Sequence, residues 1–302
     1  MQVKESFLRD LLRLIVWFPL RWLISLLPLD STFRVFKLMG DFHFLIDRPK
    51  RQYIMDRFVR NLAIDKNQAY RFVRRYFELH YLDRMHIILY PRLMLKKDLS
   101  DIVRIENIDM LTRLIDHQQG VLIVQPHFGP VQITLLALSL NGFNPLQIGY
   151  QNDIGLSKIG KRIAFKYRLY FENKLPAPII SANGYMGNAY KHLLDGGIVL
   201  TTGDGAGGGI YLGEHKDYKF FHNNRKIPLG PASLSIRTGA IFLPTFIIPD
   251  KYNHFRILFE NPIEPKYNNF EIDKIYMMGE FVSIAEKYIR KYPYNWHFWD
   301  EI

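Results

Sequence analysis

The chain has 302 residues, of which 48% are hydrophobic, so it can bury a full core and is not a disordered protein. It contains no cysteine, which excludes disulfides, thiolate nucleophiles and cysteine-ligated metals. The formal charge of +11 predicts a negatively charged partner: nucleic acid, anionic lipid or an acidic protein. The sequence has no zinc-finger spacing and no run of five basic residues, so a nucleic-acid binder rests on charge alone and we expect no nucleic-acid partner.

The N-terminal segment from 7 to 29 is strongly apolar but carries four charged side chains, Arg9, Asp10, Arg13 and Arg21. No charge-free window approaches the roughly 20 residues that a membrane span needs. On a helix the four charges cover about one third of the circumference and leave a broad apolar face, which favours a helix lying in the bilayer interface. A helix packed on the protein's own core and a tilted single span with snorkelling arginines are the alternatives. No small-residue cleavage site follows, which disfavours a signal peptide.

In the rest of the chain, the spacing of apolar residues changes near Pro91. From 31 to about 92 the apolar residues recur at helical spacing, as in YIMDRFVRNLAI. After Pro91 come short apolar runs: IVRIEN, VLIVQP, LQIGY, APIIS, GIVLTT, AIFLPTFII and FRILFE. Helical stretches separate them, at 107–117, 129–141, 155–171 and 184–194, with a last one at 273–291. This alternation predicts an α/β fold with a mainly parallel central sheet flanked by helices. We expect a membrane-attaching helix at 1–30, a helical segment at 31–100 and an α/β core at 101–302.

The stretch 203–226 is rich in glycine and then polar, and it is too long for an ordinary connection. Its first part satisfies G-x-G-x-x-G through Gly203, Gly205 and Gly208, but no convincing helix start follows, which disfavours nucleotide binding. We interpret the stretch either as a loop that needs positive φ angles or as a mobile lid over a substrate site. The sequence has no G-x-S-x-G elbow and no H-E-x-x-H motif, so we expect no serine nucleophile, no catalytic metal and no cofactor.

His127 stands at the end of the predicted strand VLIVQP, where the chain turns into the next helix. Ligands in α/β sheets bind at strand ends, so this histidine is a candidate catalytic residue, although a lone histidine is more often structural. Acyl transfer to a hydroxyl needs a base, and imidazole suits that role near neutral pH. The backbone amides of Phe128 and Gly129 are candidates for stabilising the oxyanion. Gln132, one helical turn past the loop, is placed to hold the other ring nitrogen.

These motifs resemble the late acyltransferases of lipid A biosynthesis and their lysophospholipid acyltransferase-like relatives, whose hallmark is a histidine followed after four residues by Asp or Glu. PHFGPVQ is similar to that block with Gln132 in place of the acid. In chain order, RPKRQYIMDRFVRNLAI, NIDMLTRLIDHQQGVLIVQPHFG, GIVLTTGDGAGG, IPLGPASLSIRTGAIFLP and KYPYNWHFWDEI resemble further segments of the family. The resemblance covers about residues 45 to 302.

The resemblance implies a membrane-associated O-acyltransferase on the cytoplasmic face of a bacterial inner membrane. Its donor would be an acyl-acyl carrier protein or acyl-CoA, both anionic like the partner that the basic charge predicts. Its acceptor would be a lipid or glycolipid hydroxyl. In this reading His127 is the general base and Gln132 the orienting group. Substrate contacts are expected from Phe128, Gly129, Gln151, Asn152, Asp204, Gly205 and Arg237.

Two departures from the family pattern leave alternatives open. Gln132 carries no charge to stabilise an imidazolium, and Gln151 stands where the family often has Arg. A nearby carboxylate, Asp204 or Asp153, could replace the missing charge; the enzyme could be slow; or the chain could bind lipid without turnover. If Gln132 is the orienting group, Gln132→Glu should maintain or raise activity. The basic residues Arg225, Lys226 and Arg237 are either a phosphate site or solvated surface charge.

Overall fold

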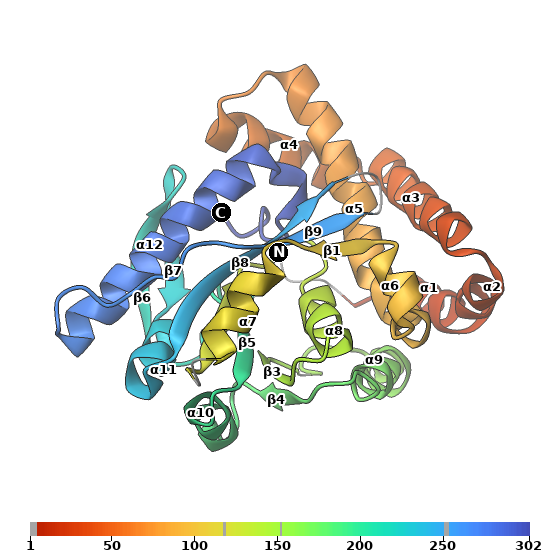
Figure 1. The fold of residues 1–302 in the computed structure, drawn as a ribbon. Coiled ribbons are helices and arrows are strands. Elements are labelled where there is room, and N and C mark those ends of the chain that lie inside the picture. The colour runs from red at the N-terminus through yellow and green to blue at the C-terminus, as the bar shows by residue number, and fades with distance from the viewer. Residues whose placement is uncertain (1–4, 117–118, 152, 251–253) are drawn as a thin grey trace.

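A seven-stranded sheet forms the centre of the computed structural model, which describes residues 5–116, 119–151, 153–250 and 254–302 (Figure 1). The strand order is β1-β9-β8-β2-β5-β3-β4. The strands are β1 Val103–Ile105, β2 Val121–Gln125, β3 Pro145–Gly149, β4 Ile179–Ser181, β5 Ile198–Thr202, β8 Ile241–Pro249 and β9 Phe255–Phe259. Every neighbouring pair is parallel except β8 and β9, so the predicted mainly parallel sheet is confirmed.

The sheet is covered by helices on both faces, which explains why its central strands are continuously apolar (Figure 1). In β2, Leu122 and Val124 belong to one hydrophobic cluster, while Val121 and Ile123 belong to the other. The covering helices of the α/β part are α7 Ile108–Asp116, α8 Gln132–Leu140, α9 Lys166–Glu172, α10 Gly187–Leu194, α11 Gly230–Thr238 and α12 Phe270–Lys291. A π-helical turn, Gly160–Phe165, leads directly into α9.

The helical segment before the sheet consists of α3 Leu29–Ile46, α4 Arg48–Leu62, α5 Lys66–Leu93 and α6 Lys96–Ser100. Asp47 and Asp65 cap α4 and α5 by accepting hydrogen bonds from the backbone of Lys50 and Gln68. Gly40 lets α3 and α5 pack closely, since an added Cβ would lie 2.5 Å from the Cα of Glu78. Residues of these helices contribute to both hydrophobic clusters, so the segment shares its core with the sheet.

The chain begins with α1 Phe7–Ile15, a π-helical turn Val16–Leu20 that contains Pro19, and α2 Arg21–Leu26. The charged side of α1 faces the protein: Arg13 pairs with Glu5 and Asp10, and Asp10 accepts from Ser157. The apolar side is exposed, with Phe7 at 84% and Leu26 in α2 at 82%. Within the described residues, no helix combines the length and apolarity that crossing a bilayer requires.

The stretch 203–226 is not one long loop as the sequence suggested. Its second half forms an antiparallel hairpin with the residues just beyond it, β6 His215–Phe220 and β7 Asn223–Pro228. The alternation that marks a strand is present in β7, because Arg225 and Ile227 are buried while Asn224 and Lys226 are exposed. The polar composition hid this signal.

Candidate active site

His127 sits in the turn between β2 and α8, at the carboxyl end of the sheet. The turn depends on Gly129, which adopts a φ of 69° that a side chain would oppose. The side chain of His127 is 22% exposed. Its imidazole is therefore held by the protein but is reachable by a ligand.

Asp204 is the partner of His127. In the parallel pair β2 and β5, Gln125 lies opposite Thr202, so His127 and Asp204 each lie two residues beyond a matched position. Asp204 Oδ1 is 2.7 Å from Nδ1 of His127, and Oδ2 accepts the backbone N–H of His127 at 2.9 Å. The carboxylate thus fixes both the ring and the backbone of the histidine.

The surroundings of Asp204 favour its charged form. The side chain is buried, and its Oδ2 also accepts the indole N–H of Trp296 at 3.0 Å. Burial alone would raise the pKa of Asp204, but the charge and hydrogen bond of His127, the charge of Arg225 and the Trp296 indole together lower that pKa below its usual value. Asp204 is therefore an ionised carboxylate bonded to the imidazole.

Gln132 does not take the orienting position that the sequence suggested. Its Oε1 accepts the hydroxyl of Tyr90, and its Nε2 donates to Glu172 Oε1 at 3.0 Å. Gln151 also donates to Glu172. The physical reason is that Gln132 opens α8 on the side facing α5 and α9, where Tyr90 and Glu172 are its neighbours.

The backbone amides of Phe128 and Gly129 donate hydrogen bonds within the protein and not toward an oxyanion site. The N–H of Phe128 donates to Pro126 and that of Gly129 to Asn295, each at 2.7 Å. The Phe128 side chain is buried against Phe246. Neither amide is free for a substrate, so the oxyanion role expected for them does not fit this geometry.

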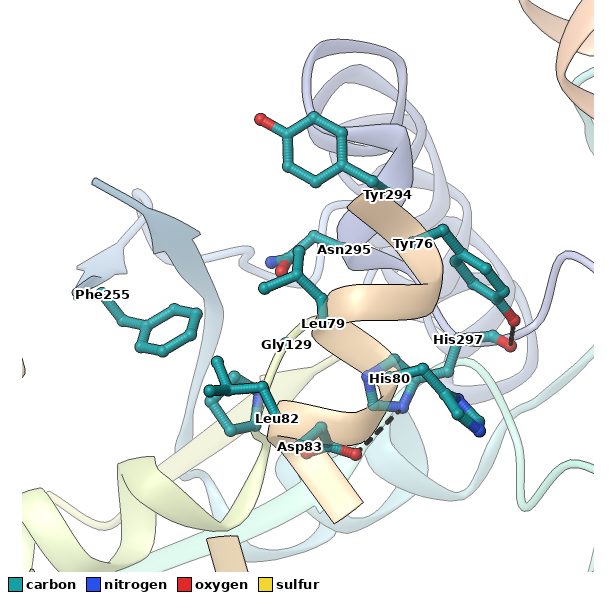
Figure 2. Close-up of a pocket in the computed structure, with 11 residues that line it drawn as sticks. Tyr76, Leu79, His80, Leu82, Asp83, Gly129, Phe255, Tyr294, Asn295 and His297 are labelled. Atoms are coloured by element: carbon teal, nitrogen blue, oxygen red, sulfur yellow. Dashed lines mark hydrogen bonds and ion pairs between the residues drawn. The ribbon is translucent and has the colours of Figure 1, made fainter. Parts of the chain in front are cut away.

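The C-terminal segment packs against His127 through His297 and Phe298. The N–H of His297 donates to the carbonyl of His127 at 3.0 Å, and the ring of Phe298 lies 4.4 Å from the imidazole. Figure 2 shows His297 facing Asp83 of α5, with the Tyr76 hydroxyl donating to the His297 carbonyl. The small space between α5 and this segment is about 10 Å³, room for one water molecule at most.

The glycine-rich loop is tied to the same segment. Glu301 accepts the N–H of Gly208 at 2.5 Å and pairs with Arg225 at 3.3 Å. Arg225 in turn donates to the carbonyl of Asp204 at 3.1 Å. Arg225 is thus a buried structural cation, and not the solvated surface charge that was one expectation for it.

His127 lines an open cavity of about 1030 Å³. That volume is large enough for a lipid-sized ligand. Gln151, Gly205 and Arg237 line it, as does Gln132, whereas Asn152 lies outside the described residues. The wall also includes Leu12 and Val16 from the N-terminal helical region.

Other candidates are placed elsewhere. Asp153 lies 3.3 Å from Lys161, so of the two carboxylates considered from sequence it is Asp204 that meets the imidazole. Across the described part of the chain, His, Asp and Glu side chains do not gather in groups of three or more suited to a metal ion.

Sequence reasoning missed Tyr90, Glu172 and Glu301. Tyr90 and Glu172 sit on helices that no motif distinguishes, and they reach the site only through packing. Trp296 belongs to KYPYNWHFWDEI, one of the segments that resemble the family, but its hydrogen bond to Asp204 could not be predicted from that resemblance.

Fold and site together define a mixed α/β protein whose imidazole–carboxylate pair, at the carboxyl edge of a mainly parallel sheet, opens onto a lipid-sized cavity. The profile of the bacterial lipid A biosynthesis acyltransferase family matches residues 6–300, and the chain belongs to this family. The family implies acyltransferase activity of the lipid A type, with an acyl donor and a lipid acceptor. A search of curated proteins found no match.

Proposed function

We propose that the protein transfers a fatty acyl chain from an acyl-carrier thioester, on acyl carrier protein or coenzyme A, to the hydroxyl of a lipid or glycolipid. His127 is the general base. The observation that carries the proposal is the bond between His127 Nδ1 and Asp204, which leaves Nε2 as the nitrogen available to the substrate.

The reaction is a direct transfer. Nε2 of His127 removes the hydroxyl proton while the oxygen attacks the thioester carbonyl. The new C–O bond forms, the C–S bond breaks, and the imidazolium returns its proton to the departing thiolate. Asp204 keeps the proton on Nδ1 and stabilises the imidazolium, as the aspartate of a serine protease triad does. Gly205, which lines the cavity next to Asp204, contributes to binding the reacting group.

Asp204 also bears on the rival function, a lipid-binding homologue without turnover. That alternative rests on Gln151, where the family often has Arg, and on Gln132, which lacks the charge that the family's acid would supply. A buried, ionised carboxylate 2.7 Å from the imidazole supplies that charge from another strand. The geometry therefore favours a competent enzyme.

Membrane association is supported by the orientation of the N-terminal helices, whose polar side faces the protein and whose apolar side is exposed. The polar side of α1 is bonded to the protein, and Trp17 is buried against Tyr167 and Phe171. The apolar side chains that stay exposed on α1 and α2 are Phe7, Leu8, Leu11, Leu12, Ile15, Trp22, Leu23 and Leu26. In α3, Leu38, Phe42, Leu45 and Ile46 are exposed as well. An exposed apolar surface of this extent, on a chain with a charge of +11, suits the interface of an anionic bilayer.

The N-terminal region also borders the site, since Leu12 of α1 and Val16 of the π-helical turn line the cavity that contains His127. A lipid substrate could then move from the bilayer to the imidazole without crossing water. We place the protein on the cytoplasmic face of a bacterial inner membrane, where acyl-carrier thioesters are available.

The experiment is an acyl-transfer assay with membranes from a deletion strain, a radiolabelled acyl donor and mixed acceptor lipids. Wild-type protein should label one lipid class, and His127→Ala should abolish the labelling while still floating with liposomes. The matched control is His222→Leu, on an exposed side chain of the hairpin turn. Full labelling by His127→Ala would remove the assigned base.

A further inference from the structure

A second histidine faces the cavity that contains His127. His297 and Asp83 both line this cavity, one from the C-terminal segment and the other from α5. Nδ1 of His297 lies 3.8 Å from Oδ2 of Asp83, which is close enough for an ion pair but too long for a hydrogen bond. Figure 2 shows this contact. The transfer described above gives this second imidazole–carboxylate pair no task.

The backbone places the two imidazoles side by side. Phe128 and Trp296 form an antiparallel β-bridge, and the N–H of His297 donates to the carbonyl of His127 beside it. The residues next to a bridged pair also face each other, so His127 and His297 are cross-strand neighbours with their side chains on one side of the bridge. Their ring centroids are 6.4 Å apart. The register of the bridge therefore directs both rings to the same cavity.

His297 is held by its main chain and is reachable by its side chain. Its carbonyl accepts the Tyr76 hydroxyl at 3.2 Å, while its N–H is bonded to His127. The side chain is 23% exposed, almost the same as the 22% of His127. Because the main chain makes both anchoring bonds, replacing the imidazole should leave the segment in place.

Asp83 favours the protonated form of His297. Nδ1 faces the carboxylate, so a proton on that nitrogen is favoured over a lone pair, and the nearby negative charge stabilises an imidazolium. An imidazolium carries an N–H at both nitrogens, whereas a neutral ring with its proton on Nδ1 has none on Nε2. The titratable groups near His297 include His80 of α5 and His127, which is paired with Asp204. Each imidazole thus has its own carboxylate to balance its charge.

Acyl transfer needs a hydrogen-bond donor at the carbonyl oxygen of the thioester. Attack by the acceptor puts negative charge on that oxygen, and donors aimed at it are usually the largest single contribution to catalysis. The amides of Phe128 and Gly129 are bonded within the protein. Two oxygens on one carbon, each about 2.8 Å from a ring nitrogen, fit between imidazoles whose centroids are 6.4 Å apart.

We propose that His297, held as an imidazolium by Asp83, is a second catalytic residue that donates a hydrogen bond to the oxyanion formed on the thioester carbonyl. The proton stays on His297 throughout, and the electron pair on the oxygen re-forms the carbonyl as the C–S bond breaks. His127 remains the base that takes the acceptor proton. This inference rests on the proposed function, because it adds a group to the same transfer.

The first test is the single-turnover rate of transfer from saturating lauroyl-pantetheine to membranes of a deletion strain, measured with the full chain. His297→Ala should slow transfer about 10²-fold, the usual cost of losing one oxyanion donor. His297→Gln keeps an N–H donor without the charge and should recover part of the loss. The matched control is His222→Gln, the same exchange on an exposed side chain, which should transfer like wild type. A folded His297→Ala that transfers within twofold of wild type would overturn the proposal.

The second test does not depend on turnover. In protein labelled with ¹⁵N-histidine, the ring nitrogens of His297 are assigned by their loss in His297→Gln. At pH 7 both should show the resonances of an imidazolium, and Asp83→Asn should convert the ring to its neutral form at the same pH. A neutral His297 in the wild-type protein would overturn the proposal whatever the transfer rate. An imidazolium that persists in Asp83→Asn would remove Asp83 from it.

His127→Ala separates this inference from the proposed function. This variant should lose acyl transfer and keep the imidazolium resonances of His297. Transfer by wild type that is unchanged in His297→Ala would sink this inference alone. Absence of transfer by wild type would sink the proposed function, and the state of the His297 ring would still decide whether Asp83 holds a charged imidazole at the cavity.

Discussion

Asp204 Oδ1 lies 2.7 Å from Nδ1 of His127, although 77 residues separate the two in the chain. The contact arises because adjacent parallel strands end at the same edge of the sheet, with both side chains two residues beyond the paired positions Gln125 and Thr202. A carboxylate just beyond the end of β5 thus occupies the place beside the imidazole that the sequence had suggested for Gln132.

This geometry reverses the expectation for Gln132→Glu. The Nε2 of Gln132 donates to Glu172, so a glutamate would set two carboxylates about 3 Å apart in a buried place. We expect acyl transfer to fall about tenfold or more and the midpoint of thermal unfolding to drop. Gln132→Met, which removes the donor without adding charge, is the control and should be milder. Activity at or above wild type in Gln132→Glu would mean that the new acid reaches His127.

Trp296 should support the charge of Asp204, whereas Trp299 should not. Both are fully buried, but the Trp296 indole donates to the Asp204 carboxylate and the Trp299 indole to the neutral carbonyl of Pro293. Because the folded pKa of Asp204 is lowered, its contribution to stability is present above the unfolded pKa and is lost as pH falls through the folded pKa.

The free energy of unfolding should therefore separate the two variants by pH. The loss in Trp296→Phe should be larger at pH 7 than at the lowest pH where the protein stays folded. The loss in Trp299→Phe, roughly 1–3 kcal/mol from packing and the lost bond, should hardly vary with pH. A pH-independent loss in both variants would count against a role for Trp296 in stabilising the Asp204 charge.

His86 gives a pH effect of a different origin. It is buried between Phe33 and Phe255, neither ring nitrogen has a partner in the structure, and burial lowers its pKa to about 3. The folded state keeps His86 neutral while the unfolded state takes up a proton below about 6.5, so stability falls as pH drops from about 6.5 toward 3.

His86→Leu should remove that slope and stabilise the protein by roughly 1–3 kcal/mol at pH 5, because two unpaired polar atoms leave the interior. Denaturant unfolding at pH 5 and pH 7.5 measures the difference. The exposed His222→Leu should leave the slope unchanged. An unaltered slope in His86→Leu would show that His86 is not buried as a neutral ring.

How far the sequence predicts this structure depends on the range of the interaction. Apolar runs such as VLIVQP are local signals, and each predicted strand of the sheet is present. The hairpin from His215 to Pro228 was missed because its exposed side chains mask the alternation.

The same distinction between local and long-range interactions applies to the site. The position of His127 at a strand end is a local property and could be predicted. Its pairing with Asp204 depends on which strands lie side by side, and the contact of Gln132 with Glu172 depends on how α8 packs on α9. Neither is encoded in the spacing of residues along the chain.

The most direct measurement is the single-turnover rate of acyl transfer by Asp204→Asn, compared with wild type at saturating donor and acceptor. Asparagine keeps the size of the side chain but loses the charge and permits the wrong imidazole tautomer, which costs roughly 10⁴ in a serine protease triad. We predict a fall of 10²-fold or more with unchanged flotation on liposomes. A folded Asp204→Asn protein that turns over within twofold of wild type would contradict the assignment of His127 and Asp204 as the working pair.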